Sequence, residues 1–398
     1  MSHVQVNLSA LFDPAVRPDP YGVLRELRET SPSMVVDGVI VVGNHADCDR
    51  VLRVPTVSSD RRKARVASLT SPQRQRSFLM LDPPDHTRLR GLVSKAFTPR
   101  TVARLAPRIA EIIDGSLAAA DPRGWDVVRD FAYPLPVRVI CELFGVPESD
   151  HELLTGWSRT LARTLEPPLS ATARDDIAAA ERAVAEFGGY VRELVERRRA
   201  HPGDDLLSRL VEIEEQGDQL TEDELVATAI LLLVAGHETT ANLIANGVVA
   251  LLRHPDQLAA LRADPARSGQ VVEEVLRYDT PVQFTSRVAL APMRVGDVQV
   301  GEGDIVMLLL AAANRDPAVF PDPDRFDTGR TGGGHLSFAA GPHFCLGAGL
   351  ARLEAGMALT ALARRVEEPV LDEDALRYRP HVNLRGPSRL VVTCVAVG

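Results

Sequence analysis

Cysteine is scarce in this sequence, and its spacing excludes several kinds of site. The 398 residues contain four cysteines, at positions 48, 141, 345 and 394. They lie too far apart to form a C-x-x-C zinc or dithiol motif. So few thiols also exclude a secreted scaffold built on disulfides, and they predict a protein of the reducing cytoplasm.

Long apolar segments are missing as well. Met1 to Pro14 has neither the basic region nor the apolar stretch of a signal peptide. The longest apolar run, Ala229 to Gly236, is too short to cross a bilayer. With 45% hydrophobic and 25% charged residues, the composition is that of a soluble globular protein. We therefore expect no membrane association.

Nucleotide-binding fingerprints are the third absence. Gly347 to Arg352 contains two of the glycines of a dinucleotide-binding loop but lacks the third, and no strand–helix–strand pattern surrounds it. A phosphate-binding P-loop and a flavin signature are also missing. Any redox chemistry of this chain therefore needs electrons from another protein.

The net charge is −9, yet positive charge is concentrated in one stretch. From Arg50 to Arg108 there are fourteen Lys or Arg residues against three Asp. A basic segment in an acidic chain predicts an acidic partner or ligand rather than nucleic-acid binding. The alternative interpretation is a solvated surface without a partner.

Hydrophobic periodicity predicts many helices and a small β part. The longest expected helix, Thr221 to Leu252, opens with a capping box of Thr221 and Glu224 and is apolar on all sides, as in a buried helix. Another expected helix, Ala348 to Arg365, follows a turn rich in glycine. We expect a mainly α chain, a single domain over residues 1–398, with a β-rich part at about 34–42, 285–310 and 378–397.

Proline sets the expected start of two helices near the basic stretch. The pair Pro83-Pro84 excludes helix before it and predicts a helix over residues 86–97. Thr98 and Pro99 then open a further helix, which we expect to run to about Ala120.

One stretch combines a thiol with residues that shape a turn. It reads Phe338-Ala339-Ala340-Gly341-Pro342-His343-Phe344-Cys345-Leu346-Gly347. Glycine and proline exclude a regular helix before Cys345 and let the backbone lie flat against a large ligand. A thiolate near the start of the next helix gains from the helix dipole. An axial sulfur ligand to haem iron has these requirements; an inert buried cysteine is the alternative.

The stretch matches the pattern F-x-x-G-x-H-x-C-x-G and resembles the haem-binding loop of the cytochromes P-450. The resemblance implies haem b as cofactor, Cys345 as the axial metal ligand, and the P-450 fold. In that fold the haem lies between the long central helix and the helix after the Cys loop. Ala339 departs from the pattern, because the family usually has glycine there. Since alanine carries a Cβ, it is tolerated there without strain if its φ is negative.

A second motif, Ala235 to Thr240, lies in the middle of the longest expected helix. Glycine, threonine and glutamate are poor choices inside a buried helix unless they have a purpose. The segment resembles the oxygen-binding groove of the P-450 family. The resemblance assigns catalytic roles to Thr239, which orders water, and Glu238, which relays protons. It places the substrate pocket at Leu232, Ala235, Gly236, Phe284 and Thr285.

Two further groups of charged residues resemble family patterns. Glu274 and Arg277 lie on one helix face, and with Arg325 they resemble a structural triad that braces the Cys loop. The second group supplies cationic or donor groups that the family directs at the haem propionates. Its members are His86, Arg90, Arg287 and His343, which with Cys345 form the expected cofactor site.

The resemblance covers about Pro20 to Val392 and implies a haem-thiolate monooxygenase. It would insert one oxygen atom from O2 into a small organic substrate, by hydroxylation or epoxidation, in bacterial secondary metabolism. The same scaffold could instead serve a peroxygenase, a phenol-coupling enzyme or a desaturase. An alternative of another class is a P-450-like docking domain without haem.

The implied electron donor is a ferredoxin with its reductase, and the implied protein is a cytoplasmic monomer that binds neither nucleic acid nor membrane. An acidic ferredoxin would dock on the Cys side, where a basic face is expected from Arg88, Lys95, Arg100, Arg104 and Arg352. The rest of the basic stretch suggests an anionic or carrier-tethered substrate. Its members are Arg61, Arg62, Lys63, Arg65, Arg74 and Arg76.

Overall fold

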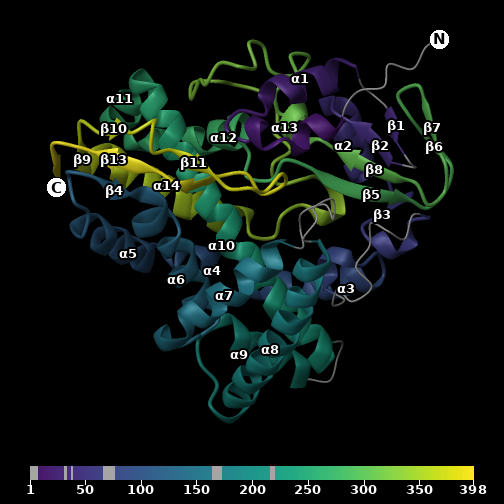
Figure 1. Ribbon diagram of the computed structural model, residues 1–398. Coiled ribbons are helices and arrows are strands. Elements are labelled where there is room, and N and C mark those ends of the chain that lie inside the picture. The colour runs from purple at the N-terminus through teal and green to yellow at the C-terminus, as the bar shows by residue number, and fades with distance from the viewer. Residues whose placement is uncertain (1–7, 31–33, 37–38, 66–76, 164–172, 216–219) are drawn as a thin grey trace.

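The computed structural model describes the chain except for residues 1–7, 31–33, 37–38, 66–76, 164–172 and 216–219. Helix α10 (Glu222–Arg253) runs through the middle of the molecule, and the other elements surround it (Figure 1). A five-stranded sheet lies to one side of α10. Helices α8 (Ala173–Ala200) and α9 (Leu206–Glu215) lie together at the lower end of the view (Figure 1).

The local sequence explains where α10 begins. The Thr221 side chain accepts a hydrogen bond from the Glu224 amide at 3.3 Å, and the Glu224 carboxylate accepts one from the Thr221 amide at 2.9 Å. This reciprocal pair confirms the predicted capping box. Helix α10 is long and apolar enough to cross a membrane, but 67% of its most apolar segment of 18 residues is buried inside the protein. The core helix of a soluble protein has the same character.

The remaining helices follow most of the predicted segments. Helix α14, after the Cys loop, has the predicted bounds. The helices are α1 (Tyr21–Glu29), α2 (His45–Arg53), α3 (Asp85–Ala96), α4 (Pro99–Ala103), α5 (Ala106–Ala118), α6 (Pro134–Leu143), α7 (His151–Ala162), α11 (Pro255–Ala263), α12 (Ser268–Tyr278), α13 (Leu310–Ala313) and α14 (Ala348–Arg365).

The helix predicted from residue 98 to about 120 is wrong in one respect, because it is two helices. Helix α4 ends at Ala103, and α5 begins at Ala106 with Pro107 in its first turn. Proline fits the first turn of a helix but cannot continue one, since it lacks the amide hydrogen. The chain therefore bends between α4 and α5.

The β part combines strands from both halves of the chain, as predicted. The main sheet has the order β1-β2-β8-β5-β3, in which β2 and β8 are parallel and the other neighbours antiparallel. Residues 37–38, the predicted turn between its first two strands, lie outside the described part. The strands of this sheet are β1 (Met34–Val36), β2 (Val39–Val42), β3 (Val57–Ser58), β5 (Thr285–Ala289) and β8 (Ile305–Leu308).

Shorter sheets lie at the edges of the molecule. The hairpin of β6 (Met293–Val295) and β7 (Val298–Val300) turns at Gly296, which has a positive φ. The other short strands are β4 (Trp125–Asp126), β9 (Val366–Glu367), β10 (Val370–Leu371), β11 (Arg377–Tyr378), β12 (Pro387–Arg389), β13 (Val391–Thr393) and β14 (Ala396–Val397). The pairing of β4 with β13 has no signal in such short segments.

Candidate active site

The loop before α14 contains two left-handed residues. Gly341 has φ +68, and a Cβ there would lie 2.4 Å from a backbone oxygen of α2, so only glycine fits. Ala339 has φ +57, so the condition under which alanine is free of strain is not met. Its amide donates to the Leu336 carbonyl oxygen at 2.8 Å, in a turn that holds this conformation. The Cys345 amide closes the loop by donating to the Phe338 carbonyl oxygen at 2.9 Å.

The Cys345 thiol faces an interior space. Cys345 is exposed, whereas Cys48 and Cys141 are buried. Burial nevertheless raises the pKa of the Cys345 thiol, while the first amides of α14 and the charges of Arg90 and Arg352 act in the opposite direction. A sulfur that protein surrounds and that remains accessible lines a chamber. Accessibility and nearby positive charge are what a ligating thiolate needs.

One face of α10 is open although most of the helix is buried. Leu232, Ala235, Gly236 and Thr239 follow one another at helical spacing and keep accessible surface. The Thr239 hydroxyl donates to the Ala235 carbonyl oxygen at 2.9 Å, a common bond for a threonine inside a helix. A Cβ at Gly236 would lie 3.0 Å from the side chain of Ile140. The missing side chain thus makes room for Ile140.

Glu238 is buried in a polar network on another face of α10. Its carboxylate forms an ion pair with Arg379 at 2.8 Å and accepts a hydrogen bond from the Tyr133 hydroxyl at 3.0 Å. The Tyr133 oxygen also accepts from Arg159 at 3.3 Å. His237 Nε2 lies 3.9 Å from the Glu238 carboxylate, and burial lowers the pKa of His237. Sequence reasoning found Glu238 but not Arg379, Tyr133 or Arg159, because these three residues come from distant segments.

The two predicted histidines meet at one end of the Cys loop. His86 is on α3, His343 is in the short 3-10 helix that precedes Cys345, and their ring centroids are 4.1 Å apart. Burial, reinforced by the charges of His86 and Arg287, lowers the pKa of His343 to about 3. The His86 Nε2 atom is buried and has no hydrogen-bond partner in the part of the chain that the structure describes. A polar group is needed to satisfy it.

The two predicted arginines are near these rings and form no ion pair with a carboxylate of the described residues. Arg90 donates to the Phe344 carbonyl oxygen. Arg287 on β5 is 6% exposed, and burial together with the charge of Arg61 lowers its pKa to about 10. A buried arginine with a second cation beside it favours an anionic ligand.

Arg61 lies beside Arg287, but the sequence did not predict it among the propionate-binding residues. It begins a short 3-10 helix, Arg61–Lys63, directly after β3, and burial lowers its pKa. Within the described residues its guanidinium forms neither a hydrogen bond nor an ion pair. The pairing of β3 with β5 brings it to Arg287, and a two-residue strand gives no sequence signal for such a pairing.

The other members of the basic stretch are different, because their charges are already compensated. The ion pairs are Arg62 with Asp60 at 2.6 Å, Lys63 with Asp82 at 2.7 Å, and Arg65 with Asp304. An anionic substrate would have to compete with these carboxylates, so the predicted role is not supported for these three residues. Arg74 and Arg76 lie outside the described residues.

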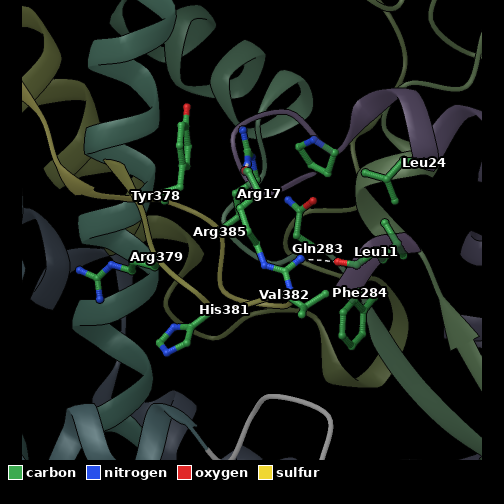
Figure 2. Close-up of a pocket in the computed structure, with 12 residues that line it drawn as sticks. Leu11, Arg17, Leu24, Gln283, Phe284, Tyr378, Arg379, His381, Val382 and Arg385 are labelled. Atoms are coloured by element: carbon green, nitrogen blue, oxygen red, sulfur yellow. Dashed lines mark hydrogen bonds between the residues drawn. The ribbon is translucent and has the colours of Figure 1, made fainter. Parts of the chain in front are cut away.

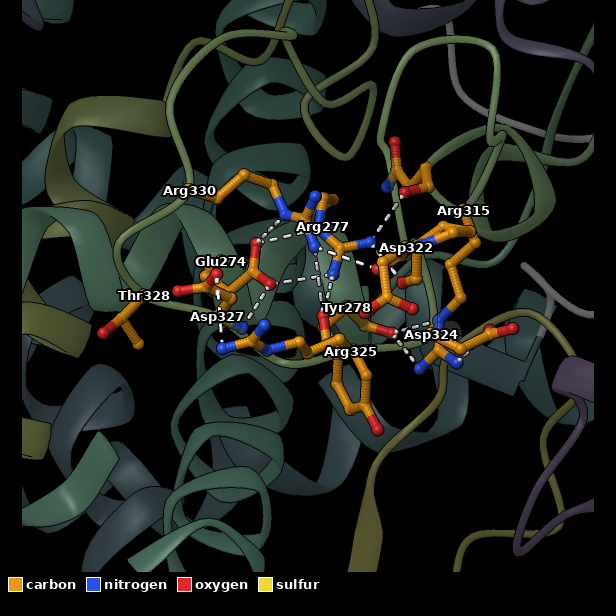
Figure 3. A network of polar contacts seen from close by, with 12 residues as sticks. Glu274, Arg277, Tyr278, Arg315, Asp322, Asp324, Arg325, Asp327, Thr328 and Arg330 are labelled. Carbon is orange, nitrogen blue, oxygen red and sulfur yellow. Dashed lines mark hydrogen bonds and ion pairs between the residues drawn. The ribbon is translucent and has the colours of Figure 1, made fainter. Parts of the chain in front are cut away.

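The predicted triad is correct in two members. Glu274 and Arg277 form a buried pair with two contacts of 2.8 Å (Figure 3). The Arg325 side chain is exposed and lies 4.0 Å from Asp327, so its predicted place is wrong. Its carbonyl oxygen accepts from Arg277 at 2.9 Å, which turns the side chain outward. Arg330 takes the place expected for Arg325, because its Nε atom lies 3.5 Å from the Glu274 carboxylate.

Phe284 and Thr285, the two predicted pocket residues that follow α12, have different surroundings. Phe284 is buried with Leu11 and Leu24 beneath α1. It lines a small cavity between the N-terminal segment and residues 378–386 (Figure 2), and the residues around this cavity include none from α10. Thr285 is half-buried at the start of β5 and accepts from Arg287 at 3.3 Å.

These residues together fit a haem. The accessible thiol fits the iron, and the arginines without a carboxylate partner and the unpartnered His86 nitrogen fit two propionates. The open face of α10 supplies a wall for a chamber in which substrate and oxygen could meet. A mainly helical fold with this site defines a haem-thiolate protein.

The comparisons identify the family. The family model for cytochrome P-450 matches residues 161–267 and 269–381. The cytochrome P-450 monooxygenase PikC of Streptomyces venezuelae is 43% identical over 389 residues, which are 94% of this chain and 91% of PikC. The chain belongs to the cytochrome P-450 family, and haem is its cofactor.

Solved structures confirm the predicted fold. Ligand-free CYP164A2 of Mycobacterium smegmatis superposes with a TM-score of 0.91 at 47% identity, over 97% of this chain and 99% of that one. P450BioI, in its complex with an acyl carrier protein ligated to hexadec-9Z-enoic acid, superposes with a TM-score of 0.86 at 37% identity. That match covers 96% of this chain and 99% of P450BioI.

Proposed function

We propose that this chain inserts one oxygen atom of O2 into a C–H or C=C bond of a small organic substrate. The second oxygen atom leaves as water, with two electrons from an external donor and two protons. Bound haem supplies the activation of dioxygen. The observation that carries the proposal is the pairing of an accessible, charge-flanked Cys345 thiol with an open face on the otherwise buried α10.

The chain's own residues bind the haem and orient the substrate. Cys345 would ligate the iron, and Arg90, Arg287, His86 and His343 would bind the propionates, together with Arg61. Because Arg287 is buried without a carboxylate partner and His86 holds an unpartnered nitrogen, a carboxylate gains strong charge-assisted hydrogen bonds there. Leu232 and Ala235 supply the apolar wall against which the substrate rests.

Proton delivery requires a rearrangement of Glu238. Thr239 is on the open face, where its hydroxyl can order water, whereas the Glu238 carboxylate is bound by Arg379 and Tyr133. We propose that Glu238 transfers protons to water near Thr239 only after it leaves Arg379. The ion pair would then keep the carboxylate away from the chamber between turnovers.

The substrate is proposed to be an apolar molecule of bacterial secondary metabolism, with a carrier-bound acid as one class. The complex of P450BioI with an acylated carrier protein supports the inclusion of carrier-bound acids. The electron donor is proposed to be an acidic ferredoxin with its reductase. The protein is proposed to be a cytoplasmic monomer.

The test uses the haem-loaded protein and a Cys345→Ser variant. We expect the reduced, CO-bound wild type to show the long-wavelength Soret band of thiolate-ligated haem, and the variant to lack it. With substrate, ferredoxin and isotopically labelled dioxygen, the product should carry one labelled oxygen atom. A wild type that binds no haem would support a docking domain. A product that forms only with peroxide would support a peroxygenase.

Substrate class can be tested by the shift of the haem from low to high spin on ligand binding. The screen should pair each free acid with the same acid on an acyl carrier protein. We expect carrier-bound acids to bind more tightly if Arg74 and Arg76 contact the carrier. Unchanged affinity at low salt in the Arg74→Gln/Arg76→Gln variant would contradict a role for these residues.

A further inference from the structure

A pair of charges lies beside the Cys345 loop, and the proposed function does not use it. Arg352, in the second turn of α14, binds Glu273 of α12 with two contacts, Nε to Oε1 at 2.6 Å and Nη2 to Oε2 at 2.9 Å. Glu273 also contacts His335 Nε2 at 3.2 Å. Sequence reasoning placed Arg352 on a docking face, but its guanidinium is engaged inside the chain.

Arg352 is fixed against the residue that closes the Cys loop. Its Cζ lies 4.6 Å from the ring centroid of Phe338. The Phe338 carbonyl oxygen accepts the hydrogen bond of the Cys345 amide at 2.9 Å. Stacking and the bidentate pair together restrict the guanidinium to one position near the sulfur.

Arg352 and Glu273 influence each other's pKa, and so do Arg352 and the Cys345 thiol. Burial alone would raise the pKa of Glu273, but its hydrogen bonds with Arg352 and His335 outweigh burial and lower the pKa to about 2. The Arg352 charge opposes the burial that raises the pKa of the Cys345 thiol. A thiolate at Cys345 in turn contributes to a raised pKa of Arg352, although the Glu273 hydrogen bond is the larger cause.

We propose that Arg352 and Glu273 are positioning residues that set the electron density on the Cys345 sulfur and thereby the reduction potential of the bound haem. Arg352 places positive charge beside the thiolate, and Glu273 both holds the guanidinium there and cancels part of its charge. The inference rests on the haem-thiolate site described above. It assigns neither residue to the iron or to the substrate.

The two charges predict shifts of opposite sign. Reduction of the ferric haem adds one negative charge, which a nearby cation stabilises. Arg352→Gln should therefore lower the midpoint potential. Glu273→Gln leaves Arg352 uncompensated and should raise it, and the double variant should lie between the two. Since Arg352 and Glu273 are both partly exposed, each shift should shrink as ionic strength rises.

The experiment is a redox titration of the haem-loaded protein, without ferredoxin, for the wild type, both single variants and the double variant. Thermal unfolding of each variant checks that it is folded. The matched control is the Arg253–Glu373 pair, which is also bidentate, at 2.9 and 2.7 Å, and does not contact the Cys loop. Arg253→Gln and Glu373→Gln should leave the potential unchanged.

A purely structural role would move both single variants in the same direction, because either change breaks the same ion pair. Shifts of equal sign, or no shift beyond that of the control pair, would overturn the inference. The CO-bound spectrum of the wild type separates this failure from a failure of the proposed function. A thiolate-type spectrum with an unmoved potential would refute only the role of Arg352 and Glu273.

Discussion

At the scale of single residues, Ala339 shows where the Cys loop is strained. A left-handed conformation costs an alanine roughly 1–2 kcal/mol relative to its preferred regions, and glycine avoids this cost. Glycine also loses more chain entropy on folding, by about 0.5–1 kcal/mol. We therefore expect Ala339→Gly to increase the free energy of unfolding by up to about 1 kcal/mol, as measured by denaturant unfolding.

The neighbouring residue provides the control. Ala340 has an extended φ of −148 and is buried, so Ala340→Gly removes a buried methyl group and gains no freedom that the fold uses. It should lower the free energy of unfolding by about 1 kcal/mol. A loss of stability in Ala339→Gly equal to that in Ala340→Gly would show that the positive φ at Ala339 carries no strain.

Replacement of Arg61 should stabilise the apoprotein but weaken the binding of haem. Without haem, Arg61→Gln removes a poorly hydrated cation beside Arg287, so apoprotein stability should rise, by on the order of 1 kcal/mol. With haem, it removes a charge-assisted bond worth about 1.5–3 kcal/mol, so haem should dissociate roughly 10 to 100 times faster. Transfer of haem to an acceptor protein measures this rate.

Arg62→Gln is the matched variant for Arg61. Arg62 is the next residue, but its guanidinium binds Asp60 and points to solvent. Haem release should hardly change in this variant. An equal acceleration in both variants would assign the effect to the segment as a whole and would contradict a direct contact of Arg61 with a propionate.

At the scale of elements, the sequence predicted those features that neighbouring residues determine. The capping box of Thr221 and Glu224, the bounds of α14 and the pairing of Glu274 with Arg277 all depend on residues within one helix. Contacts between distant segments were not predictable in this way. The partners of Glu238 and the replacement of Arg325 by Arg330 depend on how loops fold over helices, for which residue spacing carries no information.

Because Arg330 and not Arg325 contacts Glu274, the two arginines should contribute differently to the free energy of unfolding. Arg330 is close to the buried Glu274, whereas the Arg325 side chain is in solvent. Arg330→Ala should lower the free energy of unfolding by about 1–3 kcal/mol, because it leaves the Glu274 carboxylate less compensated. Arg325→Ala should change it by less than about 0.5 kcal/mol. Chemical denaturation of both variants distinguishes them, and the reverse order would restore Arg325 to the triad.

At the scale of the whole molecule, the basic stretch is less available than its composition suggests. Of the five residues expected on a docking face, three bind carboxylates within the chain: Arg88 binds Glu224, Arg104 binds Asp204, and Arg352 binds Glu273. Lys95 and Arg100 are exposed and form no ion pair with a described residue. They are near the end of α3 and the start of α4. The charge available to an acidic partner is therefore concentrated there.

This distribution predicts how an acidic ferredoxin reduces the haem. At low ionic strength, Lys95→Gln/Arg100→Gln should slow reduction by reduced ferredoxin several-fold, because opposite charges steer association. The difference from the wild type should vanish at about 0.5 M salt, where the screening length falls to a few ångströms. Stopped-flow absorbance measures the rate. Arg294→Gln, on the exposed β6–β7 hairpin, is the control and should leave the rate unchanged. Equal slowing in the control, or a loss that persists at high salt, would contradict docking through Lys95 and Arg100.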